Sequence, residues 1–233
     1  MQSALITMTP EDVELVKLAR DTVVMVAAST GRIVPTLDAS PSSCQGYAHR
    51  LGKYMESAGP VFTRISKREL IDGEPHNRNR GCECVGLLKA TRLSYAESTI
   101  QSAAHSALQA RRVGPGPKRN HKPIWPGEVG SLSLFLFIVE GFLRTKSLTA
   151  QALIDEGHDP IRYGLMAIGP RGNAVLTADL EGIDTVEKQL KAVTQKMQML
   201  RDHGFPYPSQ VDHFLRMKGR WIWDPSRPRH THF

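Results

Sequence analysis

Residues 161–180 read IRYGLMAIGPRGNAVLTADL, and this stretch decides the fold class. Its two apolar runs, residues 161–168 and 173–180, are separated by Gly169-Pro-Arg-Gly172. A short connection rich in glycine and proline between two strand-like runs is typical of a β-hairpin. The stretch therefore predicts two antiparallel strands late in the chain.

A second hairpin is predicted earlier in the chain. Residues 61–71 form a strand-like run, Asp72-Gly73 is a turn signal, and a second strand is expected near residues 82–93. Residues 131–139 are apolar on both faces, which is typical of a central strand that is covered on two sides. Residues 221–223 are expected to form a last strand at an edge of the sheet.

Helix starts are marked by side chains that cap free backbone N–H groups. Thr9-Pro10-Glu11-Asp12 places a hydroxyl at the N-cap, proline at the first helical position and acids near the positive end of the helix dipole. Ser94-Tyr-Ala-Glu97 is a capping box, and Asp184-Thr-Val-Glu187 repeats it with Asp184 as the cap. We expect helices over residues 10–30, 41–59, 95–112, 147–156, 185–203 and 208–218.

The order of these elements is mixed rather than a repeated strand–helix alternation, which predicts the α+β class. We expect N-terminal helices, an antiparallel sheet with two hairpins, and helices packed on one face of the sheet. The 233 residues fit a single domain, residues 1–233, with a sub-boundary at a basic Pro/Gly loop over residues 113–127. Residues 224–233 are expected to form a flexible tail.

Composition argues against several protein classes. The longest apolar run, residues 132–143, is about half of the roughly 20 residues that a membrane-spanning helix needs. The first residues lack the basic segment of a secretory signal peptide. The chain has 3 cysteines, and an odd number argues against a secreted disulfide framework. We therefore expect an intracellular protein of the cytoplasm or the nucleus, and we expect no cofactor because no nucleotide-binding motif is found.

Positive charge is concentrated in two parts of the chain. The whole chain has 30 Lys and Arg against 23 Asp and Glu, a formal net charge of +7. Residues 76–122 contain nine basic and two acidic residues, and residues 216–229 contain five basic residues and one acidic residue. Such segregation attracts a polyanion, and the simpler alternative is an ordinary solvated surface on a basic protein.

The basic Pro/Gly loop is the strongest candidate contact with a polyanion. Residues 111–122 carry five positive charges and no acid, and Trp125 follows them. Basic side chains neutralise phosphates and a tryptophan ring stacks on an unpaired base, whereas the alternative role of Trp125 is to anchor the loop by packing. The predicted nucleic-acid contacts are Arg78, Arg80, Arg111, Arg112, Lys118, Arg119, Lys122, Trp125, Arg216, Lys218, Arg220 and Trp221.

The C-terminal members of this set belong to a segment that interleaves basic and aromatic side chains. Residues 216–223 read RMKGRWIW. An amphipathic edge with this composition can also seat on an anionic membrane surface. A peripheral membrane protein is therefore an alternative to a nucleic-acid-binding one.

His76, Cys82 and Cys84 come closest to a metal site, because thiolates and imidazoles are zinc ligands. Two cysteines separated by a single residue do not match the spacing of a structural zinc motif. We expect no metal, and these three residues are weak candidates. A pair of cysteines that faces the protein core is the favoured alternative.

Weak catalytic candidates are His121, His213 and Cys84. Two histidines can act as acid and base in RNA cleavage, and a histidine can activate a cysteine thiol. The sequence places no orienting group beside any of them, and it lacks the common hydrolase, protease and phosphate-binding motifs. A His-dependent nuclease or transferase on an anionic substrate is therefore a less favoured alternative.

An apolar seam runs along the helix predicted within residues 184–203. It consists of Val186, Leu190, Val193, Met197 and Leu200. The seam spans two heptads, fewer than a coiled coil needs, so a helix face packed on its own sheet is favoured over self-association through this helix.

Composition and charge together favour a non-enzymatic, basic nucleic-acid-binding or structural protein. RNA is the expected ligand. Roles like those of nucleocapsid, matrix or silencing-suppressor proteins fit a small basic chain of this kind.

Overall fold

The computed structural model shows an α+β protein and describes residues 8–28, 59–71, 74–85, 93–111, 129, 131–145, 148–169, 172–180, 182–202 and 211–223. Its helices are α1 (Pro10–Ala28), α4 (Tyr95–Arg111), α5 (Ala150–Asp155) and α6 (Val186–Asp202). Its strands are β1 (Val61–Ile71), β2 (Glu74–Val85), β3 (Leu132–Thr145), β4 (Tyr163–Gly169), β5 (Gly172–Leu176) and β6 (His213–Trp223).

The strands form one sheet in the order β2-β1-β3-β6-β4-β5. β1 is antiparallel to both β2 and β3, and β4 is antiparallel to both β5 and β6. The chain divides into two compact units. Unit 1 comprises the described parts of residues 1–138 and 221–230, and unit 2 comprises those of residues 139–220. β3 and β6 therefore belong partly to each unit, and the single-domain interpretation stays a prediction.

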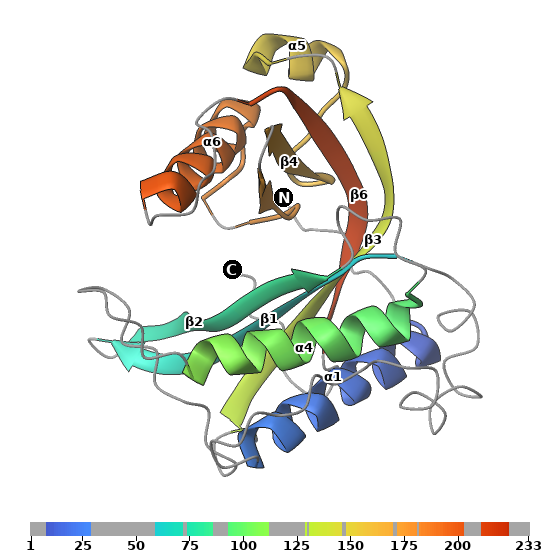
Figure 1. Cartoon of the computed structure of the whole chain (residues 1–233). Helices are drawn as coiled ribbons and strands as arrows, with labels where there is room; N and C mark the ends of the chain where they lie inside the picture. Colours follow the sequence, from blue (N-terminus) through green and yellow to red (C-terminus); the bar gives the residue numbers. More distant parts are fainter. Residues whose placement is uncertain are drawn as a thin grey trace. The chain divides into compact units, whose positions relative to one another are not determined.

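Unit 1 has a layered architecture. α4 lies on β1 and β2, and α1 packs against α4 (Figure 1). The core between these layers takes apolar side chains from alternate positions of β1 and β3, such as Ile65, Leu134 and Leu136, and from the buried faces of both helices, such as Leu15 and Ile100. Alternation along the strands puts these side chains on the helix-covered face of the sheet.

Small residues let α4 approach the sheet closely. The buried positions of this helix include Ala96, Ser98, Ser102, Ala103 and Ser106. The Ser102 hydroxyl is hydrogen-bonded to the Thr63 hydroxyl, and Ser106 Oγ donates to the Thr63 carbonyl at 3.0 Å. These bonds satisfy polar groups that would otherwise be costly to bury.

The other face of the sheet in unit 1 carries aromatic side chains. The Phe137 ring lies edge-on to Trp221 at 5.2 Å between centroids and edge-on to Phe62 at 6.0 Å. All three rings are at most 5% exposed. Edge-to-face packing of this kind adds about 0.5–1.5 kcal/mol per pair beyond the burial of area.

Unit 2 has its own core. α6 packs on β4 and β5, and α5 contacts α6 (Figure 1). The core contains Leu153 from α5, Leu165 from β4, Val193 and Met197 from α6, and Phe214 from β6. Four residues of the α6 seam, Val186, Leu190, Val193 and Met197, therefore pack within their own unit, as the sequence favoured.

Most of the predicted elements are confirmed. The strand at residues 61–71, the helix starting at Tyr95 and the late hairpin have the predicted positions. Thr9 and Asp12 cap α1 reciprocally, because the Thr9 N–H donates to Asp12 Oδ2 at 2.9 Å and the Asp12 N–H donates to Thr9 Oγ1 at 3.3 Å. The predicted helix over residues 41–59 and the tail after residue 223 lie outside the described residues.

Three predicted elements were wrong in position or type. The second strand of the first hairpin is Glu74–Val85 rather than residues 82–93. The predicted helix over residues 208–218 is instead part of the strand His213–Trp223. Residues 221–223 continue this strand between β3 and β4, so they do not form an edge strand.

Candidate nucleic-acid interface

The sequence-predicted contacts Arg78 and Arg80 lie on β2, which is the edge strand beside β1. The register places Lys67 of β1 directly opposite Arg78, and Arg68 opposite Asn77. The pairing shifts between Ile65 and Ser66, whose partners are Gly81 and Asn79. Arg80 is therefore the extra residue of a β-bulge, a feature that re-aims side chains and is common beside functional sites.

We call residues 65–68 of β1 together with residues 77–81 of β2 the basic ribbon. It carries four positive charges, Lys67, Arg68, Arg78 and Arg80, and no acidic residue. Like charges directly opposite each other repel, so this register makes an anion beside Lys67 and Arg78 electrostatically favourable. The sequence analysis identified Arg78 and Arg80 but missed the two β1 cations, because only the register brings them together.

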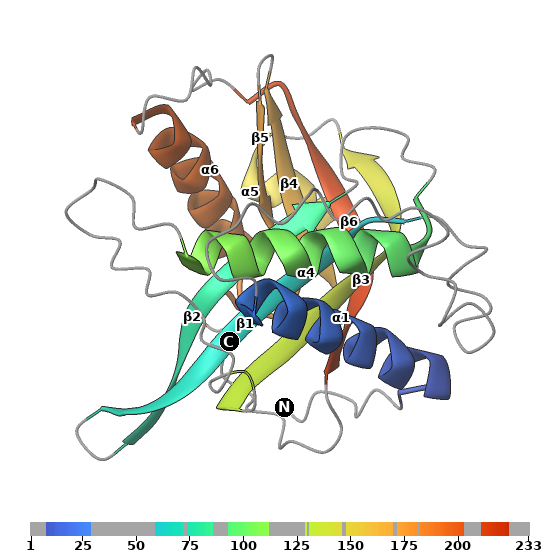
Figure 2. The ribbon, with the colours of Figure 1, turned by 60° about the horizontal axis from the view of Figure 1, so that its bottom comes forward.

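The basic ribbon lies where the sheet narrows from three strands to two. β3 pairs with β1 over Val61–Lys67 and not beyond, whereas β2 pairs with β1 to Ile71. Figures 1 and 2 both show the far end of β1 and β2 extending past α4. Only the hairpin end, residues 68–71 with 74–77, is a two-stranded antiparallel ribbon, an element that proteins use to enter a nucleic-acid groove.

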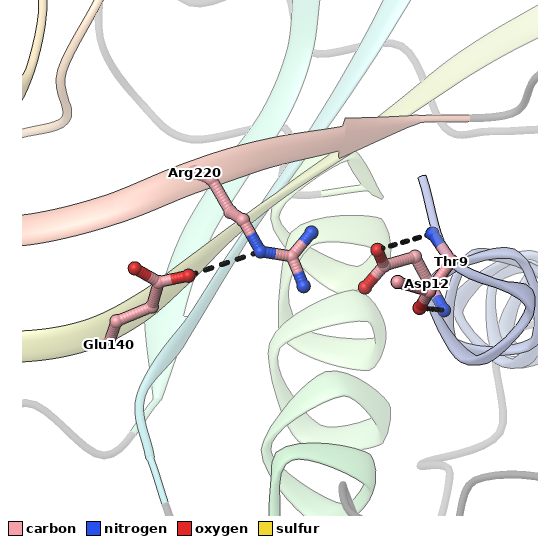
Figure 3. A network of polar contacts seen from close by, with 4 residues as sticks. All are labelled: Thr9, Asp12, Glu140 and Arg220. Carbon is pink, nitrogen blue, oxygen red and sulfur yellow. Dashed lines mark hydrogen bonds and ion pairs between the residues drawn. The ribbon is translucent and has the colours of Figure 1, made fainter. Parts of the chain in front are cut away.

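The predicted contacts on β6 have different environments. Arg216 is half-buried, donates from Nη1 to the Glu156 carbonyl at 2.7 Å and lies 5.5 Å from the centroid of the Tyr163 ring. Arg220 Nε donates to Glu140 Oε1 at 3.1 Å (Figure 3). Lys218 is exposed.

The Trp221 ring is not available at the surface, since only 4% of the residue is exposed. Both stacking on a base and seating in a membrane interface need an accessible ring. We therefore leave Trp221 out of the candidate interface. None of the helices within the described ranges is both long enough and apolar enough to cross a membrane.

Most of the basic Pro/Gly loop lies outside the described residues. Arg111 is the last residue of α4. The other predicted contacts of the loop, together with the catalytic candidate His121, lie outside the described residues: Arg112, Lys118, Arg119, Lys122 and Trp125.

The metal candidates lie on one strand. His76, Cys82 and Cys84 all belong to β2, where their register partners on β1 are Glu69, Arg64 and Phe62. Six residues of strand separate His76 from Cys82 by about 20 Å, at roughly 3.3 Å per residue. One metal ion cannot bind both from this strand. Among the described residues, no three His, Cys, Asp or Glu side chains gather as a metal site.

The remaining catalytic candidates, His213 and Cys84, lie on strands. His213 begins β6 opposite Ile168, and Cys84 on β2 pairs with Phe62. No hydrogen bond between His213 and another side chain is present in the described part of the chain. These positions therefore add no support to the enzyme alternative.

A buried histidine in unit 2 escaped the sequence analysis. His158 is 5% exposed and follows α5, and its Nε2 lies 2.6 Å from Gln189 Oε1 on α6. Gln189 Nε2 donates to the Tyr163 carbonyl at 3.0 Å, which fixes Oε1 as the acceptor for the His158 Nε2–H. The imidazole also stacks on the Tyr163 ring at 5.9 Å between centroids. Nothing in the local sequence pattern marks His158 as buried.

The environment of His158 keeps it neutral. Burial lowers the pKa of His158, and the positive charge of Arg216 lowers this pKa further. The hydrogen bond with Gln189 and the carboxylates of Asp159 and Glu156 act in the opposite direction but do not reverse the shift. Nδ1 is buried and has no hydrogen-bond partner. Because the ring is shielded from solvent, its role is to hold α5, β4 and α6 together.

Comparison with known proteins gives the fold alone. No protein-family model matches the chain, and no curated protein sequence matches it. Among solved structures, the chain is similar to the crystal structure of an uncharacterized protein from Pyrococcus horikoshii, with a TM-score of 0.58 and 16% sequence identity. The match covers 91% of this chain and 90% of that one. The chain therefore shares its fold with this archaeal protein over nearly the whole length of both.

Proposed function

We propose that this protein binds nucleic acid, with single-stranded RNA as the ligand, through the basic ribbon. The observation that carries the proposal is the register that sets Lys67 opposite Arg78 between Arg68 and Arg80, with no acid among them. A phosphate backbone relieves the repulsion between these cations, and their neutralisation of phosphates releases counterions.

Arginine and asparagine alternate along the β2 part of the ribbon, from Asn77 to Arg80. Guanidinium planes stack on unpaired bases, and amides hydrogen-bond to base edges. Unpaired bases are most accessible in single-stranded RNA, which is why RNA is the proposed ligand.

Charges on an edge strand have a second use, because they prevent edge-to-edge aggregation. Protection alone explains neither the clustering of a single sign nor the opposition of two cations, since either sign protects an edge. A binding experiment with a matched control separates the two uses.

The test measures the affinity for a labelled single-stranded RNA by fluorescence anisotropy between about 50 and 200 mM salt. The triple variant Lys67→Gln/Arg68→Gln/Arg78→Gln removes three charges from the ribbon. We expect the log–log salt slope to flatten by about 2, because each phosphate contact on a single strand contributes about 0.7.

The control variant is Lys17→Gln/Lys188→Gln/Lys191→Gln, which removes the same charge from exposed positions of α1 and α6. It should keep the slope of the unmodified protein. Equal losses in both variants would mean that net charge, and not the ribbon, binds RNA. Absence of RNA binding at low salt would refute the proposal, and tighter binding to single-stranded DNA or to anionic vesicles would reassign the ligand.

A further inference from the structure

The second half of β3 has an open edge. In the strand order β3 lies between β1 and β6, but β1 pairs with β3 only as far as Ile138. Along residues 140–144, which belong to unit 2, the edge of β3 on the β1 side has no paired strand in the part of the chain that the structure describes. Backbone N–H and C=O groups on such an edge are a template for pairing with another extended chain.

Apolar side chains on this segment are exposed on both faces. Phe142 is 37% exposed and Leu143 is 43% exposed, and neighbouring residues of a strand point to opposite faces. The residues that flank the segment are buried, since Val139 is 2% exposed and Thr145 is 1% exposed. An exposed apolar strand with an open edge is a site for strand pairing.

We propose that two copies of this protein associate by antiparallel pairing of residues 140–144, about a two-fold axis at Phe142. The segment reads EGFLR. Pairing centred on Phe142 sets Glu140 of each copy opposite Arg144 of the second copy. Glu140, Phe142 and Arg144 share one face of the strand, so two ion pairs flank a contact between the two phenylalanine rings.

This self-complementarity selects a second copy as the occupant. A closed dimer with a two-fold axis requires a surface that complements itself, and a Glu and an Arg placed symmetrically about an aromatic residue meet this requirement. An unrelated extended peptide would match the open backbone but would have no reason to match both charges.

Glu140 and Arg144 can both make these contacts. Arg144 is exposed, and it has no carboxylate partner among the described residues. Glu140 uses Oε1 for Arg220, and its second oxygen points away from Arg220 in Figure 3. Glu140 can therefore keep its contact with Arg220 and accept from a second cation.

The test uses sedimentation velocity of the full chain over a range of protein concentrations. We expect a concentration-dependent monomer–dimer equilibrium. Arg144→Glu replaces two cross-copy attractions by two repulsions and should raise the dimer dissociation constant by about tenfold or more. Arg162→Glu makes the same charge change at an exposed position of unit 2 and should leave dimerisation unaltered.

Mixing two variants gives a result that misfolded proteins could not produce. Glu140→Arg and Arg144→Glu should each be monomeric alone, because each sets like charges opposite each other. Mixed in equal amounts, they should form a heterodimer, since every charged position then faces its opposite. A monomer at every concentration, a dimer that Arg144→Glu leaves intact, or a mixture that stays monomeric would each overturn the proposal.

Discussion

At the scale of single residues, the buried imidazole of His158 makes stability depend on pH. Its pKa in the folded protein is lowered below the ordinary value of 6.5, chiefly by burial and then by Arg216. Below pH 6.5 the unfolded chain therefore binds a proton that the folded protein resists. The free energy of unfolding should fall as the pH drops from 6.5 through the lowered pKa, and it should be constant with respect to this residue above 6.5.

Urea denaturation at a series of pH values measures this dependence, and His158→Gln isolates it from the other histidines. The variant should be less stable than the unmodified protein at neutral pH, by about 1–3 kcal/mol, because it disturbs a buried hydrogen bond with Gln189. The difference in stability between the two proteins should shrink on acidification. A constant difference from neutral to acidic pH would show that His158 has an unshifted pKa.

Gly164 is a second residue at which a single substitution should change stability. A Cβ at this residue would lie 2.6 Å from Met217 Cε and 2.7 Å from the Leu176 carbonyl oxygen. The Met217 side chain can move, but the carbonyl belongs to the backbone of β5, which is paired with β4. Gly164→Ala should therefore lower the free energy of unfolding by about 1–3 kcal/mol.

Gly141→Ala is the matched control, because a Cβ there meets nothing within 4 Å. This change should be neutral or slightly stabilising, since glycine weakens a strand. Thermal unfolding of the two variants tests the comparison, and equal effects would contradict it.

Elements differ in how well the sequence reveals them, and α6 shows how local chemistry settles a boundary. The sequence indicated Asp184 as the cap, but the Lys188 N–H donates to Thr185 Oγ1 at 3.3 Å and the helix begins at Val186. Asp184 instead pairs with the Lys188 side chain at the surface. Thr185→Ala should cost about 1 kcal/mol of stability, as loss of an N-cap does.

Asp184→Ala is the counterpart of this prediction. An ion pair between two exposed side chains contributes little, so this variant should unfold at nearly the same urea concentration as the unmodified protein. The reverse order of effects would restore Asp184 as the cap.

The strand β6 shows why the sequence predicted the wrong type of element over residues 208–218. Its buried residues are Phe214, Met217, Trp221 and Ile222, and the first three are three and four positions apart, which is the spacing of a helix face. When both faces of a strand are partly covered, apolar and polar residues do not alternate along it. The hydrophobic pattern of β6 therefore does not identify it as a strand. The α+β class and most elements could be predicted because their turns and caps are local signals, whereas β6 depends on its neighbours β3 and β4.

The basic ribbon depends in the same way on pairing. The β2 sequence from Glu74 to Arg80 is polar and has no strand-like alternation, so the sequence alone predicts a connection there. The backbone of β1 supplies its hydrogen-bond partners. Charge could be read from the sequence, but the opposition of Lys67 and Arg78 could not, because a register between two strands is a property of the folded sheet.

At the scale of the whole molecule, two strands link the two units. β6 contributes Phe214 to the core of unit 2 and Ile222 to the core of unit 1, and β3 likewise passes from one unit to the other. Each unit therefore contains part of both strands. We therefore expect global unfolding to be a single cooperative transition despite the two cores.

Hydrogen exchange monitored by mass spectrometry tests this expectation with one truncation in each core. Leu153→Ala in unit 2 and Ile100→Ala in unit 1 each remove a buried side chain and should cost about 2–5 kcal/mol. If β3 and β6 couple the cores, each variant should lower the protection of the slowest-exchanging amides in both α4 and α6 by the same free energy. If Leu153→Ala accelerates exchange in α6 while α4 keeps its protection, the units unfold separately and the shared strands fray at the point where they pass between them.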